Sequence, residues 1–168
     1  MPHGAALITL ALALAACSAQ SEGEEPALPL TGRVVDVAGI WTEASEASLS
    51  ARLERLEKET QVQMVVASTP SLKGQPIEDY SRNLANAWGV GDARRNDGLV
   101  LLVAPNERQV RIEVGSGLEM QVTDAEAAQI IANDLLPSLR RGDFTNGVHS
   151  AVESLAREVA VQPMRKAA

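Results

Sequence analysis

The stretch Gly98-Leu99-Val100-Leu101-Leu102-Val103-Ala104 is apolar at every position. A strand with one face in water alternates apolar and polar side chains, whereas a strand covered on both faces does not need polar residues. We therefore expect residues 98–104 to form a strand at the centre of a sheet that is covered on both sides.

The residues that follow predict an antiparallel partner for this strand. Pro105-Asn106-Glu107 predicts a turn, and residues 108–114 alternate strictly between polar and apolar side chains. A short turn between two strands makes them antiparallel neighbours, and the alternation indicates that the second strand has one face nearer to water.

An earlier strand and helix predict a parallel neighbour on the other side. Residues 62–68 are rich in β-branched side chains and predict a strand. A helix is expected from Pro76 to Trp88, with one apolar face and with Gly89 as its stop. Since crossover connections are right-handed, the strands at 62–68 and 98–104 are expected to lie parallel.

The remaining segments complete an α/β chain order. The expected elements are a short strand at 34–37, a helix from about Thr42, a helix that begins with the capping box Thr123-Asp124-Ala125-Glu126 and is ended or kinked by Pro137, and a last helix over about 145–161. This order predicts a mixed sheet between helices.

Cys17, the single cysteine, marks the start of the mature chain in our interpretation. Residues 1–16 are apolar enough for a signal peptide but too short to span a bilayer. The sequence Leu14-Ala15-Ala16-Cys17 resembles the bacterial lipobox, in which the cysteine carries lipid. The alternatives are an ordinary signal peptide cut after Ala16, or a buried, inert thiol.

These boundaries divide the chain into four parts. Residues 17–30, rich in Ser, Glu and Pro, predict a lipidated, flexible tether. Residues 31–161 predict one folded domain, and residues 162–168 a disordered tail. Ser18 is not the aspartate that commonly retains lipoproteins in the inner membrane of Gram-negative cells, so the outer membrane is a possible destination.

The net charge of −7 argues against nucleic acid as a partner. With one cysteine there is no disulfide framework. The glycines at 89–91 and 115–117 do not have the spacing of a dinucleotide fingerprint, so no nucleotide is expected. His149 is the only histidine after the signal peptide, and neither a zinc site nor a Ser/His/Asp arrangement is supported.

Acidic residues are expected to converge at one edge of the sheet. The loop before residue 98 and the loop after residue 114 meet there, bringing together Asp92, Asp97, Glu113, Glu119 and Asp124. Carboxylate oxygens beside glycines suit a hard cation such as Ca²⁺ or Mg²⁺.

Each of these acids also has a structural interpretation. Asp97 before Gly98 is common in turns, Asp124 favours a helix N-terminus, and Glu113 can pair with Arg111 or Arg108. Asp36 is expected at the opposite edge of the sheet, where our first interpretation of it is a turn or helix-entry residue.

A series of ordered motifs resembles the TPM domain family. They are Gly32-Arg33-Val34-Val35-Asp36, Pro70-Ser71-Leu72-Lys73-Gly74, Trp88-Gly89-Val90-Gly91, Asn96-Asp97-Gly98, Arg111-Ile112-Glu113-Val114-Gly115, Gly117-Leu118-Glu119 and Thr123-Asp124-Ala125. The resemblance covers residues 31 to about 155 and implies a three-layer α/β/α sandwich, with a mixed, mostly parallel sheet of about four strands.

The resemblance also implies a membrane-tethered domain outside the cytoplasm. Members are linked to weak acid phosphatase activity and photosystem repair, to divalent-cation binding, and to modulation of a receptor. The shared acidic positions, implied as metal ligands, are Asp36, Asp97, Glu113 and Asp124. This sequence departs from the family at Ser116 and Met120, where an aromatic residue and a glycine are usual, and at its C-terminal end, so Cys17 is expected to be its only anchor.

Three functions follow as hypotheses. The first is a non-enzymatic, lipid-tethered module that binds a divalent cation and assists an unknown envelope protein. The second is a metal-assisted acid phosphatase in which Asp97 or Asp124 positions water or attacks phosphorus. The third is a purely structural interaction protein without an ion.

Overall fold

The computed structural model describes residues 28–160. The predicted signal peptide, Cys17, most of the predicted tether and the predicted tail lie outside these residues. The elements are β1 (Val34–Asp36), α1 (Glu43–Thr60), β2 (Gln63–Ser68), α2 (Ile77–Trp88), β3 (Gly98–Ala104), β4 (Gln109–Val114), α3 (Asp124–Ile130), the π-helical turn η1 (Ile131–Leu135), α4 (Leu136–Leu139) and α5 (Phe144–Ala160). Within residues 28–160, no helix is long and apolar enough to cross a membrane.

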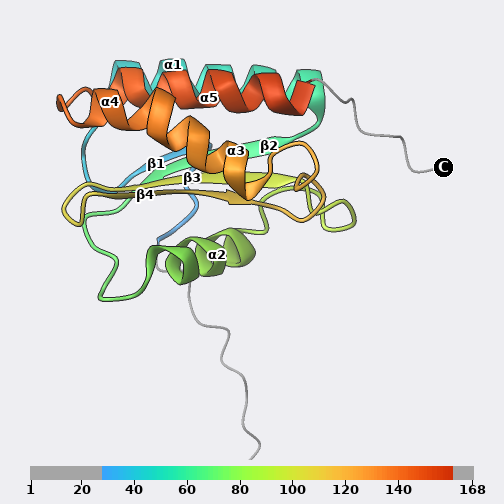
Figure 1. Cartoon of the computed structure of the whole chain (residues 1–168), viewed down its shortest axis with the longest axis horizontal. Helices are drawn as coiled ribbons and strands as arrows, with labels where there is room; N and C mark the ends of the chain where they lie inside the picture. The colour runs from blue at the N-terminus through green and yellow to red at the C-terminus, as the bar shows by residue number, and fades with distance from the viewer. Residues whose placement is uncertain (1–27, 161–168) are drawn as a thin grey trace, which may run out of the picture.

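The strands form one sheet in the order β1-β2-β3-β4. β1, β2 and β3 run parallel, and β4 runs antiparallel to β3. Helices α1 and α5 cover one face and α2 covers the other, as Figure 1 shows. The predicted α/β/α sandwich with a mixed, mostly parallel sheet is therefore confirmed.

β3 is the centre of both cores. All seven of its residues are buried, and its side chains point alternately to the two faces. Leu99 and Leu101 belong to the larger cluster, beneath α1 and α5, while Leu102 and Ala104 belong to the smaller cluster above α2. An apolar side chain is required at every position because neither face meets water.

β4 is an edge strand, as β1 is at the other side of the sheet, and the two faces of β4 differ as the alternation predicted. Val110, Ile112 and Val114 face the larger cluster. Arg111 and Glu113 lie on the opposite face, which is the face that α2 covers. The edge strand thus places charged side chains beside α2, where the candidate site is found.

The capping box at Thr123 is present, and the helix that follows contains a π-helical turn. The Thr123 hydroxyl accepts from the Glu126 amide, and the Glu126 carboxylate accepts from the Thr123 amide. Pro137 was predicted to end or kink this helix, but the helix does not end there. It widens just before Pro137, where the Leu136 amide donates to the Ile131 carbonyl, five residues back. This wider turn precedes Pro137, which has no N–H for the usual helical bond, and the helix continues to Leu139.

The folded part begins before the predicted boundary at Thr31. Leu28 is buried beside Tyr80 and Leu84 of α2. Its carbonyl oxygen accepts a hydrogen bond of 2.8 Å from the Trp88 indole. The described part of the chain therefore begins at the α2 layer of the sandwich.

Replacing Leu28 with Ala is expected to lower the free energy of unfolding by about 2–3 kcal/mol, because a buried leucine is lost. Leu30 is 41% exposed, so Leu30→Ala is the matched control and should change stability by less than about 0.5 kcal/mol. Urea unfolding of the two variants measures the difference. If both substitutions lower the free energy of unfolding by the same amount, Leu28 does not belong to the core.

Candidate functional site

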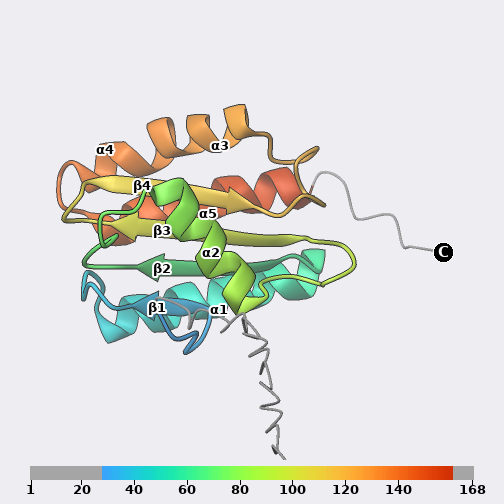
Figure 2. The ribbon, with the colours of Figure 1, turned by 90° about the horizontal axis from the view of Figure 1, so that it is seen from below.

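Two loops meet where β3 begins and β4 ends, as the topology predicted. The α2–β3 loop and the β4–α3 loop come together at this edge of the sheet, and Figure 2 shows them at the same end of the molecule. The Gly115 amide donates to the Gly98 carbonyl at 2.9 Å, and the Gly117 amide donates to the Asn96 carbonyl at 2.9 Å. The loops are therefore joined by their backbones.

Glycine is needed at this junction because the backbones approach too closely for a side chain. A Cβ atom on Gly98 would lie 2.1 Å from the Val90 carbonyl oxygen. A Cβ atom on Gly117 would lie 1.8 Å from the Arg95 carbonyl oxygen. These contacts fix the positions of both loops.

Gly117→Ala is expected to destabilise the protein by about 1–3 kcal/mol, since the backbone must move to admit the methyl group. Ser116→Ala is the matched control, because Ser116 is its exposed neighbour. Thermal unfolding of both variants tests the prediction. A Gly117→Ala protein as stable as the control would mean that the two loops are not in contact.

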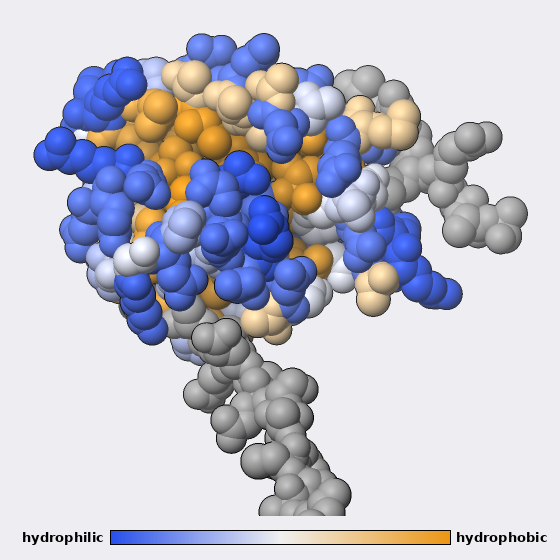
Figure 3. Space-filling view, turned by 60° about the horizontal axis from the view of Figure 1, so that its bottom comes forward, coloured by the Kyte–Doolittle hydropathy of each residue, from blue (hydrophilic) through white to orange (hydrophobic). Residues whose placement is uncertain are grey.

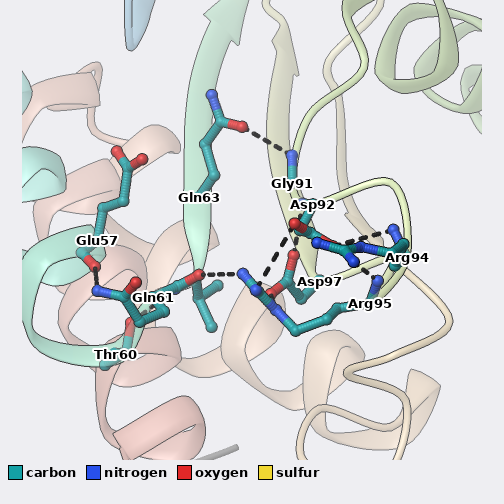
Figure 4. Close-up of polar contacts among 10 residues, drawn as sticks. Glu57, Thr60, Gln61, Gln63, Gly91, Asp92, Arg94, Arg95 and Asp97 are labelled. Carbon is teal, nitrogen blue, oxygen red and sulfur yellow. Dashed lines mark hydrogen bonds and ion pairs between the residues drawn. The ribbon is translucent and has the colours of Figure 1, made fainter. Parts of the chain in front are cut away.

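Asp97 holds the first loop from inside. Its side chain is fully buried, and Figure 4 shows it between two donors. One carboxylate oxygen accepts from the Asp92 amide at 2.7 Å, and the other accepts from Arg95 Nε at 2.5 Å. The hydrogen bond that Arg95 donates to Asp97 raises the pKa of the Arg95 guanidinium. Both carboxylate oxygens of Asp97 thus have protein partners.

Asp92 stabilises the same loop through its own carboxylate. One oxygen accepts from the backbone amides of Arg94 and Arg95, at 2.9 and 3.1 Å. These two bonds lower the pKa of the Asp92 carboxyl, because they favour its ionised form. Next to it, the Gly91 amide donates to the Gln63 side chain at 2.7 Å, which ties the loop to β2.

Glu113 lies in a separate polar cluster under β4. The Ser81 hydroxyl of α2 donates to its carboxylate at 2.9 Å. Arg111 Nε lies 3.4 Å and Arg82 Nε 3.8 Å from carboxylate oxygens of Glu113, whose side chain is only 15% exposed. The pairing with Arg111 that the sequence allowed is therefore present.

Two adjoining hollows open beside Glu113. One, of about 350 Å³, is also lined by Asn96 and Glu119, and the other, of about 460 Å³, is lined by Glu119 and Asp124. Arg82 contributes to both. The second hollow is thus surrounded by carboxylates and guanidinium groups.

The structure brings only some of the predicted acidic residues together. Glu113, Glu119 and Asp124 line one hollow, whereas Asp97 is enclosed in its loop and Asp92 lines a different hollow with Arg95. Among residues 28–160, no three His, Cys, Asp or Glu side chains are grouped closely enough to hold a metal ion.

Asp36 lies at the opposite edge of the sheet, after β1. Its carboxylate accepts from the Ile40 and Trp41 amides at 3.1 and 2.8 Å, and from the Ser68 hydroxyl. These bonds shape the turn that leads into α1. Asp36 therefore serves as the turn and helix-entry residue, far from Glu113.

Sequence reasoning did not identify Ser81, Arg82 and Arg95 as members of these clusters. Ser81 lies four residues after Ile77 and three before Leu84, so its place on the buried face of α2 could have been found from helical spacing. The partners of Arg82 and Arg95 depend on side-chain directions, for which the sequence carries no signal.

The TPM domain model matches residues 34–158. The chain belongs to the TPM domain family. Among solved structures, the N-terminal domain of a protein from P. gingivalis is similar, with a TM-score of 0.73, 30% identity and coverage of 82% of this chain and 89% of that one. The BA42 protein from Bizionia argentinensis shares the fold, with a TM-score of 0.67, 17% identity and coverage of 77% of this chain and 89% of that one.

A longer protein also contains a region similar to this TPM domain. UPF0603 protein Rv2345 from Mycobacterium tuberculosis is 22% identical over 135 residues, which cover 80% of this chain. The chain spans one fifth of the length of that relative, since the match covers 20% of it. The likeness therefore concerns one domain of a larger protein.

Proposed function

We propose that this protein is a lipid-anchored TPM domain on the extracytoplasmic side of the cell envelope, where it acts as a non-enzymatic accessory module for another envelope protein. The observation that carries the non-enzymatic part is the environment of Asp97. Its carboxylate is fully buried, and both oxygens are hydrogen-bonded by Asp92 and Arg95. The anchor rests on the lipobox that ends at Cys17.

The same environment disfavours the phosphatase hypothesis. A nucleophile needs a free oxygen that can approach phosphorus in line with the leaving group. Asp97 would have to leave Arg95 and the Asp92 amide, which would open the loop. Asp124 is exposed, but the carboxylates of Asp124, Glu113 and Glu119 outnumber the guanidinium groups of Arg82 and Arg111 in its hollow. The negative charge that remains disfavours a phosphate monoester.

We also propose a Ca²⁺ or Mg²⁺ site, with a smaller set of ligands than the sequence predicted. Glu113, Glu119 and Asp124 line one hollow and offer the oxygen ligands that hard cations prefer. Arg82, 3.8 Å from Glu113, competes for the same carboxylate. We therefore expect weak binding, on the order of 10⁻³ M, and no part for Asp97 or Asp36.

Calorimetry of the mature chain with CaCl₂ and MgCl₂ tests this cation site. The heat of weak binding should disappear in the double variant Glu119→Gln/Asp124→Asn. It should persist in Glu43→Gln, which changes an exposed acid in the first turn of α1. Absence of heat with the unaltered chain would remove the cation from the proposal and leave the accessory role in place.

The anchored, non-enzymatic role is tested on the full-length protein in cells. Mass spectrometry should find Cys17 as a lipid-modified N-terminal residue, and Cys17→Ser should move the protein from the membrane to the soluble fraction. The purified protein should not hydrolyse p-nitrophenyl phosphate. An unmodified mature N-terminus would contradict the anchor, and hydrolysis that Asp124→Asn abolishes would establish the phosphatase instead.

A further inference from the structure

The largest hollow described in the molecule lies at the other end of β4, away from the acidic residues. It has a volume of about 640 Å³ and is lined by the half-buried side chains of Val110, Leu136, Leu139 and Phe144. Figure 3 shows a hydrophobic area open at the surface and bordered by hydrophilic residues. Ligand sites commonly have such a volume and combine apolar side chains with a few polar groups, as this hollow does.

Two arginines give this hollow a positive rim. Arg108 and Arg140 line it and are exposed, and neither forms an ion pair with another residue of the described range. No acidic side chain of residues 28–160 lines the hollow. The complementary ligand is therefore an anion that carries an apolar group.

The backbone of β4 adds hydrogen-bonding groups to the same hollow. Because the Gly115 amide donates to Gly98, the alternation of an antiparallel pair directs the amide and carbonyl of Val110 away from β3. No other segment of residues 28–160 hydrogen-bonds to the Val110 backbone. The next position with the same orientation, Ile112, is 2% exposed, so at this end of β4 Val110 is the accessible position.

Local backbone features set this end of β4 apart. Arg108 has a φ of 56°, a left-handed conformation that is uncommon for arginine. The π-helical turn η1 immediately precedes Leu136, and such turns are frequent at functional sites. Both features set the directions of side chains around the hollow.

We propose that this hollow binds the free C-terminus of a partner protein that ends in a large apolar residue. The terminal residue pairs with Val110 as an antiparallel extension of the sheet, so the partner chain ends near Arg108. Its amide donates to the Val110 carbonyl, its carboxylate accepts from the Val110 amide and from Arg108 and Arg140, and its side chain enters the hollow. This inference rests on the proposed accessory role, since it names the class of partner.

The test is an NMR titration of the ¹⁵N-labelled mature chain with the hexapeptide Gly-Ser-Gly-Thr-Val-Leu, which has a free carboxylate. The amide signals of Val110, Leu139 and their neighbours should shift. The same peptide with a C-terminal amide should bind about tenfold more weakly, because it loses its charge-assisted hydrogen bonds.

Variants of the protein supply the second arm of the test. Arg108→Glu and Arg140→Glu should each weaken binding about tenfold. Arg94→Glu is the matched control, an equal charge change at an exposed arginine outside the hollow, and it should bind like the unaltered protein. Because the altered side chains are exposed, all three variants are expected to fold.

Several results would overturn the inference. They are no shift with the free-acid peptide, equal binding of the amidated peptide, shifts that map away from Val110, or binding unchanged by both arginine variants. Tighter binding of sodium decanoate than of the peptide would assign the hollow to aliphatic anions instead. If the peptide does not bind but Cys17 is found to be lipid-modified, the anchored accessory role stands. The partner would then bind another surface of the domain.

Discussion

The carboxylate of Asp97 holds the loop between α2 and β3 in a single conformation. Buried before the first residue of β3, it accepts from the Asp92 amide on one oxygen and from the Arg95 guanidinium on the other. A buried carboxylate is tolerated only when such partners satisfy it. The loop closed in this way is the surface against which Gly117 packs, so the position of the β4–α3 connection depends on it.

This constraint also shapes what the edge of the sheet can do chemically. An acid that holds a loop together is not free to bind a metal ion or attack phosphorus, and Asp36 is similarly engaged at the opposite edge. The carboxylates that remain in contact with a hollow are accompanied by Arg82 and Arg111, which reduce its negative charge. The four acidic positions that this chain shares with the TPM domain family therefore include residues whose role is structural.

The fold could be predicted from the sequence because burial of a strand shows in the pattern of apolar residues within that strand. The apolar run of β3 and the alternation of β4 predicted their places in the sheet, and the order of strands and crossovers predicted that two distant loops meet. The hydrogen-bond partners of the side chains within those loops could not be predicted from the sequence. Asn96 adopts a left-handed φ of 48° between Arg95 and Asp97, so whether those neighbouring side chains meet depends on one backbone angle. Leu28 was missed because it follows a polar segment.

Hydrogen exchange of the Asp92 amide shows whether Asp97 holds its loop closed, because that amide is protected only if it donates to a buried carboxylate. In the unaltered protein its exchange should be as slow as that of the Leu101 amide in β3. In Asp97→Asn the protection of the Asp92 amide should fall markedly, while that of the Leu101 amide should change much less. Rapid exchange of the Asp92 amide in the unaltered protein would mean that Asp97 does not hold the loop closed and that its carboxylate is free for chemistry.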